Sequence, residues 1–110
     1  MRRGDVVTVA TAGDYGKPRP AVIVTADILL NQDHDAIAIC QLTSTLNDLA
    51  DYRITIEPTA ENGLRLKSDI MADKPVTVAR RRVGPVIGRL SDQDIQRLNI
   101  ALQFALGLRG

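Results

Sequence analysis

The sequence predicts a mainly β fold with some helix, of the α+β class. A small antiparallel sheet is expected to curl into a partly open barrel, and one helix is expected to close the C-terminus. Over the first two-thirds of the chain, apolar and β-branched residues recur with the period of two that strands require, whereas the C-terminal segment follows a helical period. The length of 110 residues leaves room for one compact domain, so we expect residues 1–110 to form a single domain.

Each strand is predicted from a short apolar run between turn-forming residues. The runs cover residues 5–10, 20–26, 36–42, 52–57, 64–71, 75–80 and 86–89. The third run is apolar at nearly every position, which indicates burial on both faces. Asn62 and Gly63 predict a tight turn, so residues 52–71 are expected to form a hairpin.

The C-terminal helix is predicted from its start signal and its period. Ser91 is a typical N-cap residue, and acidic residues follow it in the first turn, where the helix dipole favours them. Apolar residues then recur at helical spacing at Ile95, Leu98, Leu102 and Leu106. Gly107 is expected to end the helix.

Composition limits the classes of function. The net charge of +1 produces no strong overall field, so any contact with a polyanion must come from local clusters of basic residues. A single cysteine, Cys40, excludes an internal disulfide and a cysteine-rich zinc site. The sequence shows no apolar signal segment and no run of roughly 20 apolar residues, so we expect a cytoplasmic protein with no membrane contact.

Three local patterns have the residue types that bind or react with phosphate esters. Arg19 lies between two prolines where a Gly-rich loop enters a strand, and a guanidinium there would bind a phosphate through two oxygens; a solvated strand-end arginine is the alternative. Thr43, Ser44 and Thr45 end the third strand with hydroxyls, which also make ordinary turn hydrogen bonds. Lys67 and Asp69 are two residues apart on a predicted strand, so their side chains are expected on one face. There they would form either an acid–base pair or a surface ion pair of little consequence.

The basic residues Arg80, Arg81, Arg82 and Arg89 form the main positive cluster of the sequence. They suit an RNA backbone, or a solvated strand edge that prevents aggregation. His34 lies in a polar stretch and receives no role. Cys40 falls within an apolar strand and is expected to be an inert core residue.

Considered jointly, several stretches resemble the MazF/PemK family of toxins. They are Arg3-Gly4-Asp5-Val6-Val7, Arg19-Pro20-Ala21-Val22-Ile23-Val24, Cys40-Gln41-Leu42-Thr43-Ser44, and Ile87-Gly88-Arg89-Leu90-Ser91 with the helix after it. The resemblance runs from Arg3 to about Leu108. Two stretches depart from the family pattern: Ala12-Gly13-Asp14-Tyr15 in the first loop, and Met71, which stands where the family usually has arginine.

The resemblance implies a CcdB/MazF-like barrel and a catalytic set. Arg19 corresponds to the phosphate-binding catalytic arginine and Thr43 to a catalytic threonine, Asp69 falls where some members have a general base, and Lys67 stands where those members have a general acid. The 2′-hydroxyl proton would be removed by Asp69 or by a water that Thr43 polarises. The RNA-binding residues are expected to be Gly16, Lys17, Ser44, Arg80, Arg82 and Arg89, with no metal and no cofactor.

The function that follows from the resemblance is that of a toxin of a type II toxin–antitoxin system. We expect a sequence-selective endoribonuclease that cleaves single-stranded RNA without a metal and leaves a 2′,3′-cyclic phosphate. Expected partners are a second copy of the chain, an acidic antitoxin and, through the antitoxin, operator DNA. Residues 69–78 are expected to contribute an exposed strand edge to the homodimer, with Met71 as an apolar contact. The alternatives are a CcdB-like toxin that binds gyrase, and a weakly active member that mainly binds its antitoxin.

Overall fold

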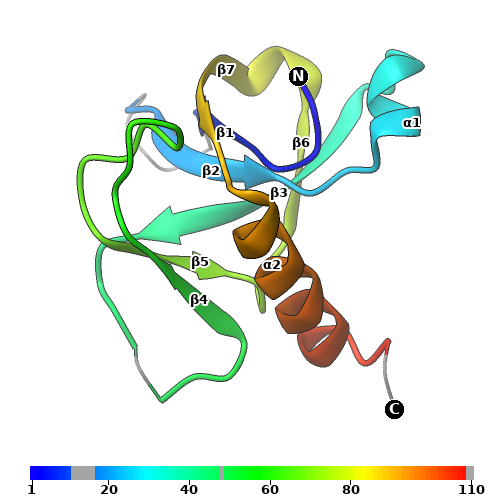
Figure 1. Cartoon of the computed structure of the whole chain (residues 1–110). Helices are drawn as coiled ribbons and strands as arrows, with labels where there is room; N and C mark the ends of the chain where they lie inside the picture. Colours follow the sequence, from blue (N-terminus) through cyan, green and yellow to red (C-terminus); the bar gives the residue numbers. More distant parts are fainter. Residues whose placement is uncertain (11–16, 48, 109–110) are drawn as a thin grey trace.

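The computed structural model describes residues 1–10, 17–47 and 49–108 and shows a curled antiparallel sheet with a C-terminal helix (Figure 1). Strands and helices follow one another as β1 (Asp5–Val9), β2 (Arg19–Ile23), α1 (Asp27–Asn31), β3 (Ala36–Thr43), β4 (Arg53–Ile56), β5 (Ser68–Met71), β6 (Val76–Ala79), a 3-10 turn (Arg80–Arg82), β7 (Val83–Arg89) and α2 (Asp92–Ala105). The predicted class of a mainly antiparallel sheet with a terminal helix is therefore confirmed.

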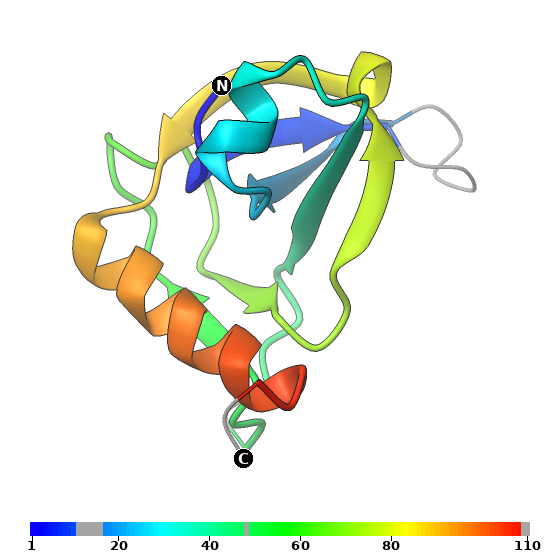
Figure 2. The ribbon, with the colours of Figure 1, turned by 90° about the vertical axis from the view of Figure 1, so that its right-hand side faces the viewer.

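The strands of the described residues form one sheet in the order β4-β5-β3-β2-β1-β7, and β6 pairs with β3 outside this path. One edge of β3 pairs with β2, and the other pairs with β6 near its start and with β5 at its end. Figure 2 shows how this arrangement wraps the strands around a common interior. Because β3 joins three neighbours, its position is fixed along its whole length.

The alternation of β3 separates two apolar cores. Cys40 and Leu42 pack into the core that lies under α2, whereas Ile37 and Ile39 pack into a second core that includes Leu30 of α1. All four side chains are buried. The prediction that this strand is buried on both faces is confirmed.

Helix α2 begins and ends where the sequence predicts. The Ser91 side chain accepts a hydrogen bond from the Asp94 backbone nitrogen at 3.1 Å, as an N-cap does. Gly107 follows the helix with a φ of +69°, in the left-handed region that favours glycine. Leu98 and Leu102 are buried against the sheet, so the predicted apolar stripe faces the core, although Leu106 is 50% exposed.

Two local features differ from the prediction. Strand β2 ends at Ile23, before the predicted residue 26, and the short helix α1 follows it, where the sequence predicts no helix. Strands β4 and β5 do pair as a hairpin, but β5 begins at Ser68, and residues 57–67 form a long connection in place of a tight turn at Asn62 and Gly63. Asn62 folds this connection back on itself through hydrogen bonds with Thr59.

The expected edge over residues 69–78 is also corrected in part. Strand β5 is paired on both sides, with β3 and with β4, so residues 68–71 form no edge. Strand β6 pairs with β3, and Val76 on it is 40% exposed. No helix in the described part of the chain combines the length and apolar character that crossing a bilayer requires.

Candidate functional site

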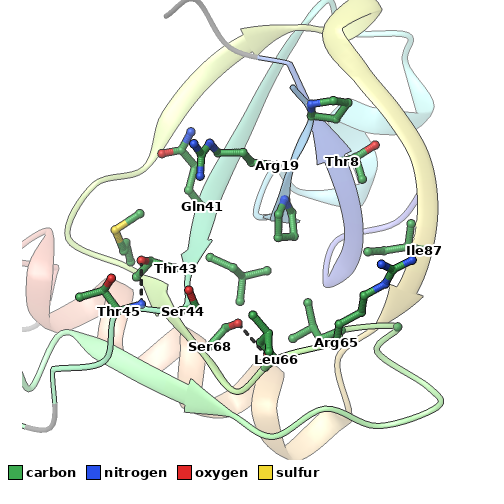
Figure 3. Close-up of a pocket in the computed structure, with 16 residues that line it drawn as sticks. Thr8, Arg19, Gln41, Thr43, Ser44, Thr45, Arg65, Leu66, Ser68 and Ile87 are labelled. Carbon is green, nitrogen blue, oxygen red and sulfur yellow. Dashed lines mark hydrogen bonds between the residues drawn. The ribbon is translucent and has the colours of Figure 1, made fainter. Parts of the chain in front are cut away.

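A pocket of about 830 Å³ opens where the start of β2, the end of β3 and the β4–β5 connection meet (Figure 3). Strands β1, β5 and β7 contribute one or two residues each. The described residues that line it are Thr8, Pro18, Arg19, Pro20, Gln41, Leu42, Thr43, Ser44, Thr45, Gly63, Leu64, Arg65, Leu66, Ser68, Met71 and Ile87. A volume of this size is typical of pockets that bind small molecules or single nucleotides.

The pocket combines apolar side chains with hydroxyls and two guanidinium groups. Leu42, Leu64 and Ile87 supply apolar surface, whereas the hydroxyls come mainly from the end of β3. Arg19 and Arg65 are at its border, where Arg19 is exposed, and none of the described lining residues is a carboxylate. A pocket with cations and hydroxyls but no acidic side chain attracts anions, and its apolar surface can accept the flat face of a base.

Arg19 is positioned by the strand that it begins. It is paired with Val9 of β1, and Pro18 and Pro20 restrict the backbone on both sides of it. Two residues further along β2, Ala21 pairs with Gln41 of β3. In the close-up, the side chains of Arg19 and Gln41 extend from the two strands toward the same rim of the pocket (Figure 3).

The hydroxyl residues are held by a turn at the end of β3. Thr43 is the last residue of β3 and is half-buried, and its Oγ1 accepts a hydrogen bond from the Thr45 backbone nitrogen at 3.2 Å. This bond turns the chain so that Ser44 and Thr45 also line the pocket. The structure therefore brings together Arg19 with Thr43 and Ser44, which two separate sequence patterns indicate.

Arg65 is a pocket residue that sequence reasoning missed. The connection that carries it is fixed by Asn62, which is buried and whose Oδ1 accepts hydrogen bonds at 3.0 Å from the backbone nitrogens of Thr59 and Leu64. The Asn62 side chain also donates to the Glu57 carbonyl at 2.9 Å. The Asn-Gly pair is a visible signal of a turn here, but nothing local shows that this turn faces the end of β3.

Lys67 and Asp69 do not form the predicted pair. Lys67 lies before β5 and its ammonium is 3.4 Å from the Glu57 carboxylate at the surface. Asp69 is fully buried within the sheet, and neither side chain lines the pocket. The alternation that would have placed them on one face does not apply, because Lys67 is outside the strand. The predicted placement of Lys67 and Asp69 side by side on one strand face is therefore wrong.

Two arginines of the predicted basic cluster, Arg80 and Arg89, make hydrogen bonds within the fold. Arg80 donates at 3.0 Å to the carbonyls of His34 and Leu30, which ties the 3-10 turn to α1. Arg89 donates to the Arg3 carbonyl at 2.8 Å and to the Asp5 carboxylate at 3.1 Å.

The remaining predicted RNA-binding residues that the structure describes are not among those that line the pocket. Arg82 is exposed and contacts the Ala10 carbonyl at 3.5 Å. Lys17 is exposed just before β2, and Gly16 lies outside the described residues. Among the described residues, neither Lys17 nor the arginines at 80, 82 and 89 line the pocket.

Two further features can be placed. Cys40 is fully buried, and desolvation raises the pKa of its thiol from 9.0 to about 11; Arg3 has a smaller lowering effect on this pKa and Asp73 a smaller raising effect. The prediction that Cys40 is a core residue is confirmed. No group of three or more metal-ligating side chains lies together among residues 1–10, 17–47 and 49–108.

Comparison with known proteins identifies the family. A family model described as a PemK-like, MazF-like toxin of type II toxin–antitoxin systems matches residues 2–106. A probable endoribonuclease MazF from Mycolicibacterium smegmatis is 39% identical over 111 residues, covering 100% of both chains.

Solved structures share the fold. An endoribonuclease in complex with its cognate antitoxin, from a mycobacterial species, has a TM-score of 0.82 at 22% identity and covers 100% of this chain and 98% of its own. The Mycobacterium tuberculosis toxin MazF-mt6 has a TM-score of 0.81 at 22% identity, and the match covers 96% of this chain and 99% of that toxin's chain. The family match and the 39% identical relative extend across nearly the whole chain, and the chain therefore belongs to the MazF/PemK family of toxins of type II toxin–antitoxin systems.

Proposed function

We propose that this toxin is a sequence-selective endoribonuclease that cleaves single-stranded RNA without a metal. The observation that carries the proposal is the pocket at the end of β3, where Arg19 and Arg65 flank the hydroxyls of Thr43, Ser44 and Thr45. The name of the relative from M. smegmatis, a probable endoribonuclease, supports the same activity.

In the proposed reaction the 2′-oxygen of a ribose attacks the adjacent phosphorus, and the bond from phosphorus to the 5′-oxygen breaks. Arg19 holds the phosphate and stabilises the charge of the pentacoordinate transition state. A water polarised by Thr43 accepts the 2′-hydroxyl proton, and solvent supplies a proton to the leaving oxygen. Lys67 and Asp69 have no part in these transfers. The products are a 2′,3′-cyclic phosphate and a 5′-hydroxyl.

Binding and selectivity are assigned to other pocket residues. Ser44 and Arg65 contact the backbone next to the scissile phosphate, and Lys17 and Gly16 extend this contact toward the first loop. The apolar surface of Leu66 and Ile87 packs against a base. Because a glutamine amide both donates and accepts, Gln41 at the rim reads the edge of that base. In this proposal Arg80, Arg82 and Arg89 act in the fold and not on RNA.

The proposed assembly is a cytoplasmic homodimer that is inhibited by an acidic antitoxin. Ile100 and Phe104 are each 60% exposed and lie four residues apart on one face of α2, so they offer apolar surface to a second copy. One structural neighbour is an endoribonuclease in complex with its cognate antitoxin, which supports an antitoxin as partner. Operator DNA would be reached through the antitoxin.

Incubation of the purified toxin with a long unstructured RNA in excess EDTA tests the proposal. We expect cleavage at a few sequence motifs, with 5′-hydroxyl ends that polynucleotide kinase labels directly. Cleavage that stops on chelation and returns with Mg²⁺ would contradict the metal-independent mechanism.

Two alternatives give different results in the same assay. A weakly active member would bind its antitoxin tightly and leave the RNA intact. A gyrase-binding toxin would leave RNA intact and inhibit supercoiling; the family match favours cleavage over this alternative.

A further inference from the structure

Asp69 is a buried carboxylate that the proposed reaction does not use. It lies in β5 directly opposite Thr43 of β3, and its side chain is 0% exposed. A buried charge is costly unless hydrogen bonds and an opposite charge compensate it. The partners of this carboxylate therefore indicate what the residue does.

Both carboxylate oxygens of Asp69 accept hydrogen bonds. Oδ2 accepts from the backbone nitrogen of Asn47 at 2.8 Å, and Oδ1 accepts from the Thr55 hydroxyl at 2.5 Å. Thr55 lies in β4, across the β4–β5 ladder from Asp69. The carboxylate thus joins the segment after β3 to the strand that follows it.

Arg53 connects the same carboxylate to the pocket wall. Its Nη1 lies 4.0 Å from Oδ2 of Asp69 and donates to the Thr45 carbonyl at 3.3 Å. Thr45 in turn donates its backbone N–H to Thr43 Oγ1. A continuous chain of contacts therefore leads from Asp69 through Arg53 to Thr45 and Thr43, which both line the pocket.

The segment that these contacts hold is otherwise exposed. Residues 44–47 are all exposed, so little packing fixes their conformation. A hydroxyl contributes to catalysis only when it is held close to its productive geometry, and the bond from Asn47 to a buried carboxylate provides a rigid anchor.

From this geometry we propose that Asp69 is a positioning residue for the pocket. It fixes residues 43–47 so that Thr43 and Thr45 present their hydroxyls to the phosphate, and it acts through Asn47 and Arg53 without touching RNA. The inference rests on the proposed ribonuclease function for its catalytic consequence, although the anchoring itself does not depend on RNA.

The pair Asp69→Asn and Asp69→Ala tests the inference. An asparagine accepts from Asn47 through its carbonyl and donates its amide to Thr55, whose hydroxyl turns to accept, so the anchor is retained without a base. We expect Asp69→Asn to keep kcat within about fivefold of wild type, whereas Asp69→Ala lowers kcat by about thirtyfold or more. KM should change little in both, because Arg19 and Arg65 still bind the backbone.

Two further measurements extend the test: the activity of a variant of Thr55, and hydrogen exchange, which needs no RNA. Thr55→Val removes one donor to Asp69 and should lower kcat in the same direction as Asp69→Ala, by a smaller factor. Hydrogen exchange at the Asn47 amide should accelerate about tenfold or more in Asp69→Ala and remain near wild type in Asp69→Asn. Asp92→Asn, at an exposed position in the first turn of α2, is the matched control and should change neither quantity.

The outcomes separate the two proposals. If folded Asp69→Asn cleaves RNA as slowly as Asp69→Ala while its exchange at Asn47 stays normal, the positioning role is overturned. Asp69 would then act in proton transfer. Unchanged exchange at Asn47 in Asp69→Ala would overturn the anchor. If the wild-type protein cleaves no RNA while exchange at Asn47 differs between Asp69→Ala and Asp69→Asn as expected, the ribonuclease proposal is refuted and the anchor stands.

Discussion

At the scale of single residues, Arg19 is the side chain on which the proposed chemistry depends most. If it stabilises transition-state charge, Arg19→Ala should lower kcat by about a hundredfold or more with little change in stability, because the side chain is exposed. Initial cleavage rates on a short RNA, with circular dichroism as a check of folding, would measure this. Arg81→Ala, an exposed arginine of the 3-10 turn, is the control and should cleave normally. Full activity of Arg19→Ala would contradict the phosphate role.

Cys40 gives a prediction about pH. Its pKa is raised to about 11 by burial, so between pH 9 and 11 the unfolded thiol loses its proton while the folded thiol keeps it. The contribution of this group to stability is therefore complete below pH 9 and is lost as pH rises toward 11, by about 1.4 kcal/mol per pH unit.

Urea unfolding of wild type and Cys40→Ala across this range measures the effect of the thiol. The difference in unfolding free energy between the two proteins should shrink as pH rises, and a constant difference would refute the shift. Native Cys40 should also resist alkylation at pH 8 until the protein is unfolded.

The pocket residues show what can and cannot be predicted from sequence at this scale. Arg19 and Thr43 are predictable because proline restriction and a strand end act locally. The surroundings of Asp69 could not be predicted, because nothing in the sequence indicates that Thr55 and the Asn47 backbone surround it. Arg65 was missed because its place in the pocket depends on contacts between segments far apart in the chain.

At the scale of elements, the β4–β5 connection shapes the pocket through Gly63. This glycine has a φ of +69°, and a Cβ on it would overlap the carbonyl oxygen of Ile87. Gly63→Ala should therefore lower the free energy of unfolding by more than about 1 kcal/mol and weaken RNA binding, since Arg65 lies two residues later.

Gly107→Ala is the matched control for Gly63→Ala. Gly107 has the same φ of +69°, but a Cβ added there would meet nothing within 4 Å, so only the backbone cost applies. Denaturant unfolding should show a smaller loss for Gly107→Ala and no loss of RNA binding. Equal losses in the two variants would show that contact with Ile87 is unimportant.

Helices and strands were predictable where short-range sequence signals such as capping and alternation are strong. The start of α2 at Ser91 and the double burial of β3 were predictable, because capping and alternation are encoded within a few residues. The short helix α1 was not, since Asp27–Asn31 follows a β-branched run without a capping side chain. It is stabilised by tertiary contacts, among them Leu30 in the core and the hydrogen bond that Arg80 donates to the Leu30 carbonyl.

At the scale of the whole molecule, the exposed apolar face of α2 predicts a dimer. Sedimentation at micromolar concentration should give twice 12.0 kDa. Phe104→Glu places a charge in this face and should shift the protein toward monomer, whereas Gln32→Glu, which adds the same charge at an exposed position after α1, should not. A wild-type protein that is monomeric and still cleaves RNA would refute the dimer. A Phe104→Glu variant that stays dimeric would place the interface outside this face of α2.

The pocket also has a consequence for how the toxin is made. Its walls come from Thr8 near the start of the chain and from Ile87 near the end, and β7, which carries Ile87, pairs with β1. A growing polypeptide on the ribosome therefore lacks one wall of the pocket until most of the chain has been synthesised. Each nascent chain thus lacks a complete pocket while its own synthesis continues, and the proposed cleavage can begin only after Ile87 and the strand that carries it have left the ribosome.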